Sequence, residues 1–302
     1  MRRAPCTARS HGFLEAALLA VVGWLLPTTA PATEVPLYEV KVPLTGTTET
    51  DRSAGFVEAL RGVAVRVSGR SEAATNATIA AADPARYVQR YSTSVDRVLT
   101  VGFDGRSIDR LLQQASLPYW AAERPLTVIE APAADRAEAL RAAHWRALPV
   151  EWSEAGRAAE PGPSRALLKG TPSGTLFDWS FTHAGQTAQG HGSLQDGINL
   201  AADTLAARYA PASSRGTSTL VLRVDGMDGL GAYAGLLDYL DSLSLVRDVA
   251  VEALEGGVLR LRLTMRGDRE LLGRIAALDG RLLPAVQNAG TAAPGADFQF
   301  QP

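Results

Sequence analysis

Cysteine is almost absent from this chain of 302 residues, because Cys6 is the only one. One thiol cannot close an intramolecular disulfide, and it cannot build a cysteine-based zinc site, which needs several ligands. Covalent cross-links within the chain are therefore excluded as a source of stability. Buried apolar area has to supply that stability instead.

Lysine is also scarce: Lys41 and Lys169 are the only two, so arginine carries almost all the positive charge. The formal net charge is −2, and no stretch combines clustered basic residues with interleaved aromatic residues. A surface that follows the phosphates of a nucleic acid needs such a cluster. The sequence therefore predicts no nucleic-acid partner.

The N-terminal segment, in contrast, has a pattern typical of a secretory signal peptide. Arginines precede an apolar run over residues 16–26, and a stretch rich in small residues follows over 27–32. The apolar run is shorter than the roughly 20 residues that span a bilayer. We expect export, cleavage after Ala32, and no stable membrane span in the cleaved chain. Cleavage there also removes Cys6, which leaves no thiol nucleophile.

The rest of the chain predicts an α+β protein built of several small units. Apolar and polar residues alternate over 38–44, as in a half-exposed strand, and apolar residues over 51–67 recur at helical spacing. A stretch rich in Ser, Gly and Pro follows the helical pattern over 193–209. We predict an N-terminal α+β domain, a middle α/β domain, a linker and a C-terminal domain, over 33–124, 125–210, 211–217 and 218–302.

The C-terminal domain has the clearest pattern. Leu259, Leu261 and Leu263 alternate with polar residues, as they do in a strand with one covered face. Helical spacing precedes and follows the hairpin that contains this strand, and a last strand is expected at 282–283 or 298–300. The order β-α-β-β-α-β predicts a ferredoxin-like domain.

Candidate catalytic and metal-binding residues lie near a predicted hairpin with a turn at Gly185. His183 and His191 flank this turn, so a zinc site completed by Asp178 or Asp196 is one interpretation. A hydrolase with Ser193 as nucleophile and His191 as base is another. Ser193 is also a good helix N-cap, and no Gly-x-Ser-x-Gly elbow is present. We favour solvated histidines and a capping serine, and we predict no catalytic set, metal or cofactor.

A set of arginines and one tyrosine is the candidate binding surface. Guanidinium groups bind carboxylates and phosphates through paired hydrogen bonds. The alternative is that these arginines cap helices and pair with nearby acids. The set comprises Arg66, Arg70, Arg86, Tyr87, Arg90 and Arg124.

Several strings together resemble an uncharacterised family of exported proteobacterial proteins, the domain of unknown function DUF2066. They include residues 64–70, 85–91, 117–120 and 123–125, and the resemblance extends over nearly the whole cleaved chain. The chain departs from the family over 152–166, where members have a longer middle. The resemblance implies the periplasm of a Gram-negative cell and carries no known activity.

Two functional hypotheses follow. The first is a non-catalytic binding or assembly module for an envelope protein or for peptidoglycan. It rests on small α+β units without a catalytic set, and its link to envelope binding is an analogy of fold. The second is an envelope hydrolase that uses His191 and Ser193.

Overall fold

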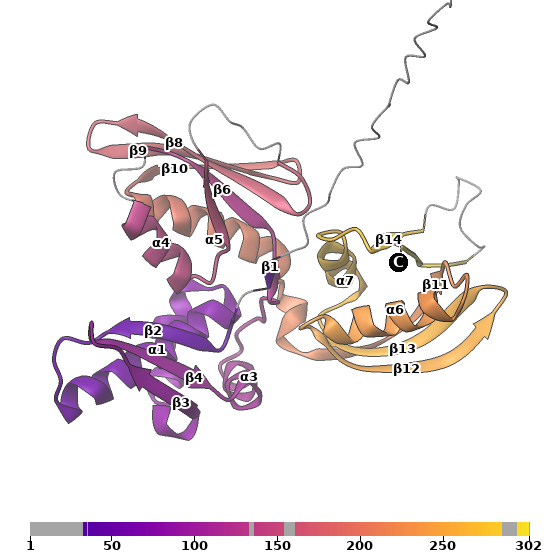
Figure 1. Cartoon of the computed structure of the whole chain (residues 1–302), viewed down its shortest axis with the longest axis horizontal. Helices are drawn as coiled ribbons and strands as arrows, with labels where there is room; N and C mark the ends of the chain where they lie inside the picture. The colour runs from indigo at the N-terminus through magenta and orange to yellow at the C-terminus, as the bar shows by residue number, and fades with distance from the viewer. Residues whose placement is uncertain (1–32, 35, 133–135, 154–160, 286–294, 302) are drawn as a thin grey trace, which may run out of the picture.

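The computed structural model describes residues 33–34, 36–132, 136–153, 161–285 and 295–301. In these residues the chain forms three units, each a β-sheet with helices against it, which confirms the α+β class (Figure 1). The predicted signal peptide and most of the predicted loop over 153–164 lie outside the described residues. No described helix is long and apolar enough to cross a membrane.

The N-terminal unit is an antiparallel sheet in the order β2-β4-β3 with α1 against it. Helix α1 starts with a capping box between Thr48 and Asp51, and it ends at Gly69. Gly69 has a φ of +69°, and a Cβ there would lie 2.7 Å from the Trp120 ring, so only glycine fits. The elements are β2 (Glu39–Pro43), α1 (Glu49–Ser68), α2 (Ala77–Ala80), β3 (Val88–Thr93), β4 (Val98–Phe103) and α3 (Gly105–Gln114).

The middle unit has a mixed sheet in the order β10-β9-β8-β6-β7. β6 is parallel to both its neighbours, whereas β8, β9 and β10 are antiparallel. The predicted hairpin turn at Gly185 and the helix capped by Ser193 are both present. The elements are β6 (Leu126–Glu130), α4 (Arg136–Trp145), β7 (Val150–Ser153), β8 (Arg165–Ser173), β9 (Leu176–His183), β10 (Gln186–Gly192) and α5 (Leu194–Tyr209).

The C-terminal unit has the predicted element order but a different sheet edge. A short 3-10 helix precedes it, and the strands lie in the order β12-β13-β11-β15-β14. In a ferredoxin-like sheet the strand that follows the second helix lies beside the first strand and antiparallel to it. Here the neighbour of β11 on that side is β15, which is parallel to β11. Both candidate last strands exist. The elements are β11 (Thr217–Asp225), α6 (Leu230–Ser242), β12 (Val246–Glu255), β13 (Val258–Arg266), α7 (Arg269–Ala276), β14 (Leu282–Pro284) and β15 (Phe298–Phe300).

Residues 211–217 pack against the N-terminal unit. Ser214 is buried, and its hydroxyl accepts a hydrogen bond from the Tyr119 backbone N–H at 2.9 Å. A two-stranded sheet of β1 (Thr33–Glu34) and β5 (Glu123–Arg124) lies where the units meet. Residues 211–217 and the small sheet of β1 and β5 therefore connect the units through hydrogen bonds.

Arg124 is the centre of the junction between the N-terminal and middle units. Its side chain is fully buried and donates to carbonyl oxygens at the ends of two helices: Arg66 in α1, and Arg146 and Ala147 just after α4. It also stacks on Trp120, with Cζ 3.6 Å from the ring centroid. The last carbonyls of a helix have no partner within the helix and carry its negative dipole end. One guanidinium thus binds a carbonyl in the last turn of α1 and two carbonyls that follow α4.

Two further buried arginines extend the same junction. Arg66 donates to the carbonyl oxygens of Pro36, Leu37 and His144. Arg146 donates to Gly69 O and pairs with Asp203 at 2.6 Å. Burial lowers the pKa of Arg66 to about 10, and burial together with Arg66 lowers the pKa of Arg124 well below its usual value. Carbonyl dipoles, rather than matching carboxylates, stabilise most of this charge.

We predict that Arg124→Met strongly destabilises the protein. Methionine fills much of the volume but leaves several buried carbonyls without donors, which costs on the order of 3 kcal/mol in the free energy of unfolding. Urea denaturation followed by tryptophan fluorescence measures the loss. Arg141→Met is the matched control, since Arg141 is exposed on α4 and should change stability by less than about 0.5 kcal/mol. Equal losses in the two variants would contradict the role of Arg124.

Candidate functional site

A second polar junction fixes the C-terminal unit against the N-terminal one. Asp109 on α3 accepts hydrogen bonds from Tyr38 Oη at 2.8 Å and from Arg247 at 2.6 Å, and it pairs with Arg266 at 3.0 Å. Burial, together with Tyr119 and Asp109, raises the pKa of Tyr38, which keeps its hydroxyl a protonated donor. These contacts hold Tyr38, α3 and the C-terminal sheet in fixed positions relative to one another.

Glu123 and Ser244 make the second set of contacts across this junction. The Glu123 carboxylate accepts from the Ser244 backbone N–H at 2.7 Å and from its hydroxyl at 2.8 Å. The Ser244 hydroxyl in turn accepts from the Ala122 N–H at 2.8 Å. The segment 119–123 is thereby tied to the loop between α6 and β12.

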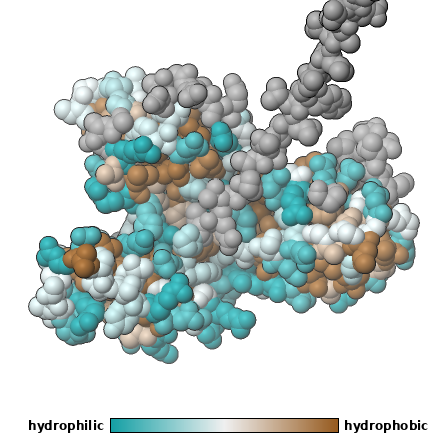
Figure 2. All heavy atoms as spheres, viewed as in Figure 1, coloured by the Kyte–Doolittle hydropathy of each residue, from teal (hydrophilic) through white to brown (hydrophobic). Residues whose placement is uncertain are grey.

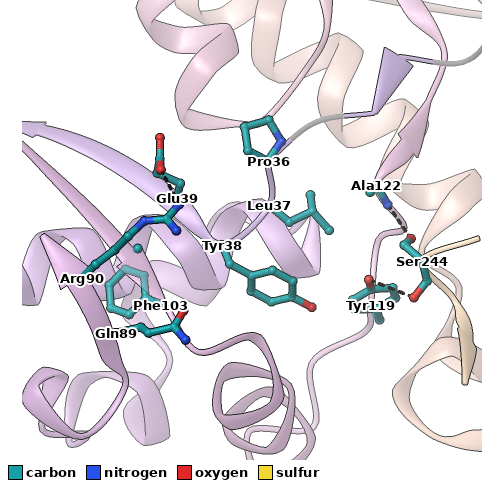
Figure 3. Close-up of a pocket in the computed structure, with 11 residues that line it drawn as sticks. Pro36, Leu37, Tyr38, Glu39, Gln89, Arg90, Phe103, Tyr119, Ala122 and Ser244 are labelled. Atoms are coloured by element: carbon teal, nitrogen blue, oxygen red, sulfur yellow. Dashed lines mark hydrogen bonds and ion pairs between the residues drawn. The ribbon is translucent and has the colours of Figure 1, made fainter. Parts of the chain in front are cut away.

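A hollow of about 300 Å³ lies between these fixed walls (Figure 3). Tyr38 points across it toward Tyr119 and Ser244, whereas Glu39 and Arg90 lie on the opposite side. Its size is at the lower end of the range for small-molecule pockets. The lining residues are Pro36, Leu37, Tyr38, Glu39, Gln89, Arg90, Gly102, Phe103, Tyr119, Ala122 and Ser244.

The hollow combines aromatic rings with a row of polar side chains. Tyr38, Phe103 and Tyr119 supply the rings. Arg90 Nη2 lies 3.1 Å from Glu39 Oε2, and the Arg90 side chain is 73% exposed. Arg90 lies over Gly102, where a Cβ would be 2.9 Å from its Cγ. Donors and acceptors therefore lie side by side at the rim. Phe103 and Tyr119 are each only 3% exposed, so Tyr38 offers most of the accessible aromatic surface.

The structure divides the predicted arginine set. Arg66 and Arg124 are not surface residues, because both are buried and bound to carbonyls, so the expectation of an exposed surface is wrong for these two. Arg70 is half-buried and donates to Ala210 O at 3.5 Å. Only Arg90 lines the main hollow. Arg86 and Tyr87 line a smaller hollow of about 280 Å³ together with Ser107 and Arg110 of α3.

The two histidines of the zinc hypothesis are not brought together. His183 is 2% exposed and its Nε2 lies 2.9 Å from the Tyr209 hydroxyl, whereas His191 is exposed and its Nδ1 lies 2.8 Å from Asp178. His191 is opposite Asp178 in the hairpin, five residues from His183 along β9, so the two side chains point to opposite faces. Across the described residues, no three metal-ligating side chains gather as a metal site.

Ser193 has the capping role that its sequence position predicts. Its hydroxyl donates to Asp196 at 2.7 Å and accepts from the Asp196 backbone N–H at 3.3 Å. Its side chain is therefore engaged within the capping box. The contacts of His191 and Ser193 go to different carboxylates, Asp178 and Asp196, and no hydrogen bond joins the two residues in the described part of the chain.

Sequence reasoning missed most residues that line the hollow. Tyr38 and Glu39 were predicted only as part of a strand, and Ser244 lies in a loop that has no recognisable motif. Tyr119 occurs in the string Leu117–Trp120, and Gln89 and Arg90 occur in the string over 85–91; both strings carry the family resemblance, and Arg90 was also in the predicted arginine set. The missing information is tertiary, since five segments of the chain, from Pro36 to Ser244, come together to form the hollow.

Comparison with known families matches residues 32–121 to a model described as a domain of unknown function, DUF8605. This match covers the N-terminal unit and supports an uncharacterised domain there, and it does not confirm the resemblance to DUF2066. No curated protein and no solved structure matches the chain.

We predict that Ser193→Ala lowers the free energy of unfolding by about 1 kcal/mol, since helix α5 loses its N-cap. Ser193→Asn should retain most of that stability, because its side-chain oxygen can accept the same hydrogen bond. Thermal unfolding of the three proteins measures the effect. If the asparagine variant is stable yet fails to complement a deletion strain, the capping role does not account for Ser193.

We also predict an acid-sensitive contribution from His183. Burial lowers its pKa to about 4, whereas an unfolded histidine titrates near pH 6.5. The unfolded state therefore binds the proton first, so this contribution is complete above about pH 6.5 and is lost as the pH falls toward 4. The loss between pH 7 and pH 4.5 is on the order of 2 kcal/mol.

His183→Gln removes the titration while keeping a polar contact for Tyr209. Its free energy of unfolding should fall less steeply between pH 7 and pH 4.5 than that of the parent protein. A parallel curve for His183→Gln would show that His183 does not supply the pH dependence.

Proposed function

We propose that the protein is a non-catalytic binding module of the periplasm that holds an envelope glycan, with peptidoglycan as the polymer. The N-terminal signal-peptide pattern supports export. The observation that carries the binding role is the hollow lined by the aromatic residues Tyr38, Phe103 and Tyr119 and by the polar residues Glu39, Gln89 and Arg90.

A sugar ring suits such a hollow. Sugar rings have apolar faces that lie against aromatic rings, and aromatic side chains provide a large apolar surface at low conformational cost. Sugar hydroxyls both donate and accept hydrogen bonds. The rim offers an acceptor in Glu39, donors in Arg90 and both in Gln89. The size of the hollow suits one ring of the polymer.

Binding is favoured over hydrolysis because of where the candidate catalytic side chains lie. A glycosidase needs two carboxyl groups that flank the scissile bond. Glu39 is the only carboxylate that lines the described hollow, and it is paired with Arg90. Ser193 and His191, the residues of the hydrolase hypothesis, belong to the middle unit and do not line it.

The test is sedimentation of the purified mature protein with peptidoglycan sacculi. We predict that Arg90→Ala reduces the bound fraction at least fivefold, since the rim loses its donors and the ion pair with Glu39. Thermal stability should hardly change, because Arg90 is exposed.

Arg52→Ala is the matched control, since Arg52 forms an exposed ion pair with Glu49 on α1 and does not line the hollow. It should sediment like the parent protein. If the parent protein stays in the supernatant, or if Arg90→Ala sediments equally well, the glycan proposal is wrong. Recovery of one repeated envelope protein by crosslinking, without sedimentation, would indicate a protein partner instead.

A further inference from the structure

A larger cleft of about 730 Å³ lies between α3 of the N-terminal unit and the sheet of the C-terminal unit. Helix α3 supplies Arg106, Asp109 and Arg110, and the strands supply Arg247 and Arg266. The surface over α3, in the lower middle of the view, is hydrophilic (Figure 2). The hydrogen bond between Tyr38 and Asp109 separates this cleft from the glycan hollow, because Tyr38 lines the hollow and Asp109 lines the cleft.

The charge of the cleft is strongly positive although the whole chain is formally −2. Its lining has four arginines and one carboxylate, Asp109. Asp109 is already shared by Tyr38, Arg247 and Arg266. In the described part of the chain, Arg106 and Arg110 form no ion pair, although Asp104 lies near enough to interact with both charges. Positive charge therefore exceeds negative charge around an open space.

Arg266 provides an independent indication of a missing partner. The residue is 3% exposed, and its Nε is buried without a hydrogen-bond partner among the described residues. Its other contacts are Asp109 and the face of Tyr119, with Cζ 4.5 Å from the ring centroid. Buried polar atoms are almost always paired in folded proteins, and a buried charged donor is costly to leave unpaired. Arg266 also lines the cleft, so an acceptor bound there would meet its side chain together with those of the other three arginines.

The same positive surface continues around α3. Arg110 also lines the smaller hollow with Arg86 and Tyr87, and its Nη2 donates to Ser107 at 3.0 Å. Because Arg110 lines both the cleft and the smaller hollow, the two spaces are neighbours along α3. The exposed guanidinium groups of Arg106 and Arg110 are thus available from one helix, while Arg247 and Arg266 face it from the sheet.

We propose that this cleft binds a phosphoryl group, clamped between α3 and the C-terminal sheet. A phosphoryl group carries several acceptor oxygens directed to different sides, which suits guanidinium groups that approach from two units. A carboxylate has two oxygens in one plane and suits fewer such donors. The ligand joins two units, so it should also stabilise their arrangement.

The experiment titrates the mature protein with inorganic phosphate, with glycerol phosphate and with vesicles of phosphatidylglycerol. Calorimetry and thermal unfolding are the readouts for the first two, and flotation is the readout for the vesicles, with phosphatidylcholine vesicles as the blank. The expected result is saturable phosphate binding and a rise in Tm. The response to glycerol phosphate or vesicles then identifies a soluble ester or a lipid headgroup as the source of the phosphoryl group.

The variant R106Q/R110Q should weaken phosphate binding at least tenfold and abolish the rise in Tm. Both side chains are exposed, so the fold should be kept. R52Q/R61Q on α1 makes the same change in net charge at partly exposed positions outside the cleft, and should bind like the parent protein. Absence of binding to all three probes, or equal weakening by both double variants, would overturn the proposal. Its outcome is independent of sacculus sedimentation, which tests the other site.

Discussion

The structure depends on buried guanidinium groups that complete the capping of two helix ends. The C-terminal ends of α1 and α4 meet inside the protein, where backbone N–H groups bind some of their last carbonyls and buried arginines bind others. Arg124 donates to both ends, and Arg66 and Arg146 bind the carbonyls around it. Each arginine is stabilised by several carbonyl dipoles, and the carbonyls that it binds gain a donor inside the protein.

The fixed junctions explain why the two proposed sites lie between units. A cleft between units that move independently would have no constant shape. Here Asp109 binds Tyr38, Arg247 and Arg266, and Glu123 binds Ser244, so the walls on both sides are defined before any ligand arrives. Such preorganisation lowers the entropy that binding costs. The small units thereby form one scaffold with binding surfaces at the junctions.

The elements that a local sequence pattern determines could be predicted from the sequence. Helix α1, the hairpin of β9 and β10, and the capped helix α5 follow from apolar period, turn glycines and an N-cap. Strand β3 was missed because most of its residues are exposed and have no alternation to detect. The place of β15 beside β11 could not be predicted either, because it depends on pairing across a long separation. For the same reason the arginine set mixed buried Arg124 with exposed Arg90: exposure is a tertiary property.

Tyr38 and Asp109 connect the two proposed sites physically. The Tyr38 ring is a wall of the hollow, and its hydroxyl binds Asp109 Oδ1, while Asp109 Oδ2 binds the two arginines of the cleft. One carboxylate therefore fixes the Tyr38 ring on one side and Arg247 and Arg266 on the other. A change at Asp109 would alter the wall of the hollow and the wall of the cleft together, because its two oxygens bind residues of both.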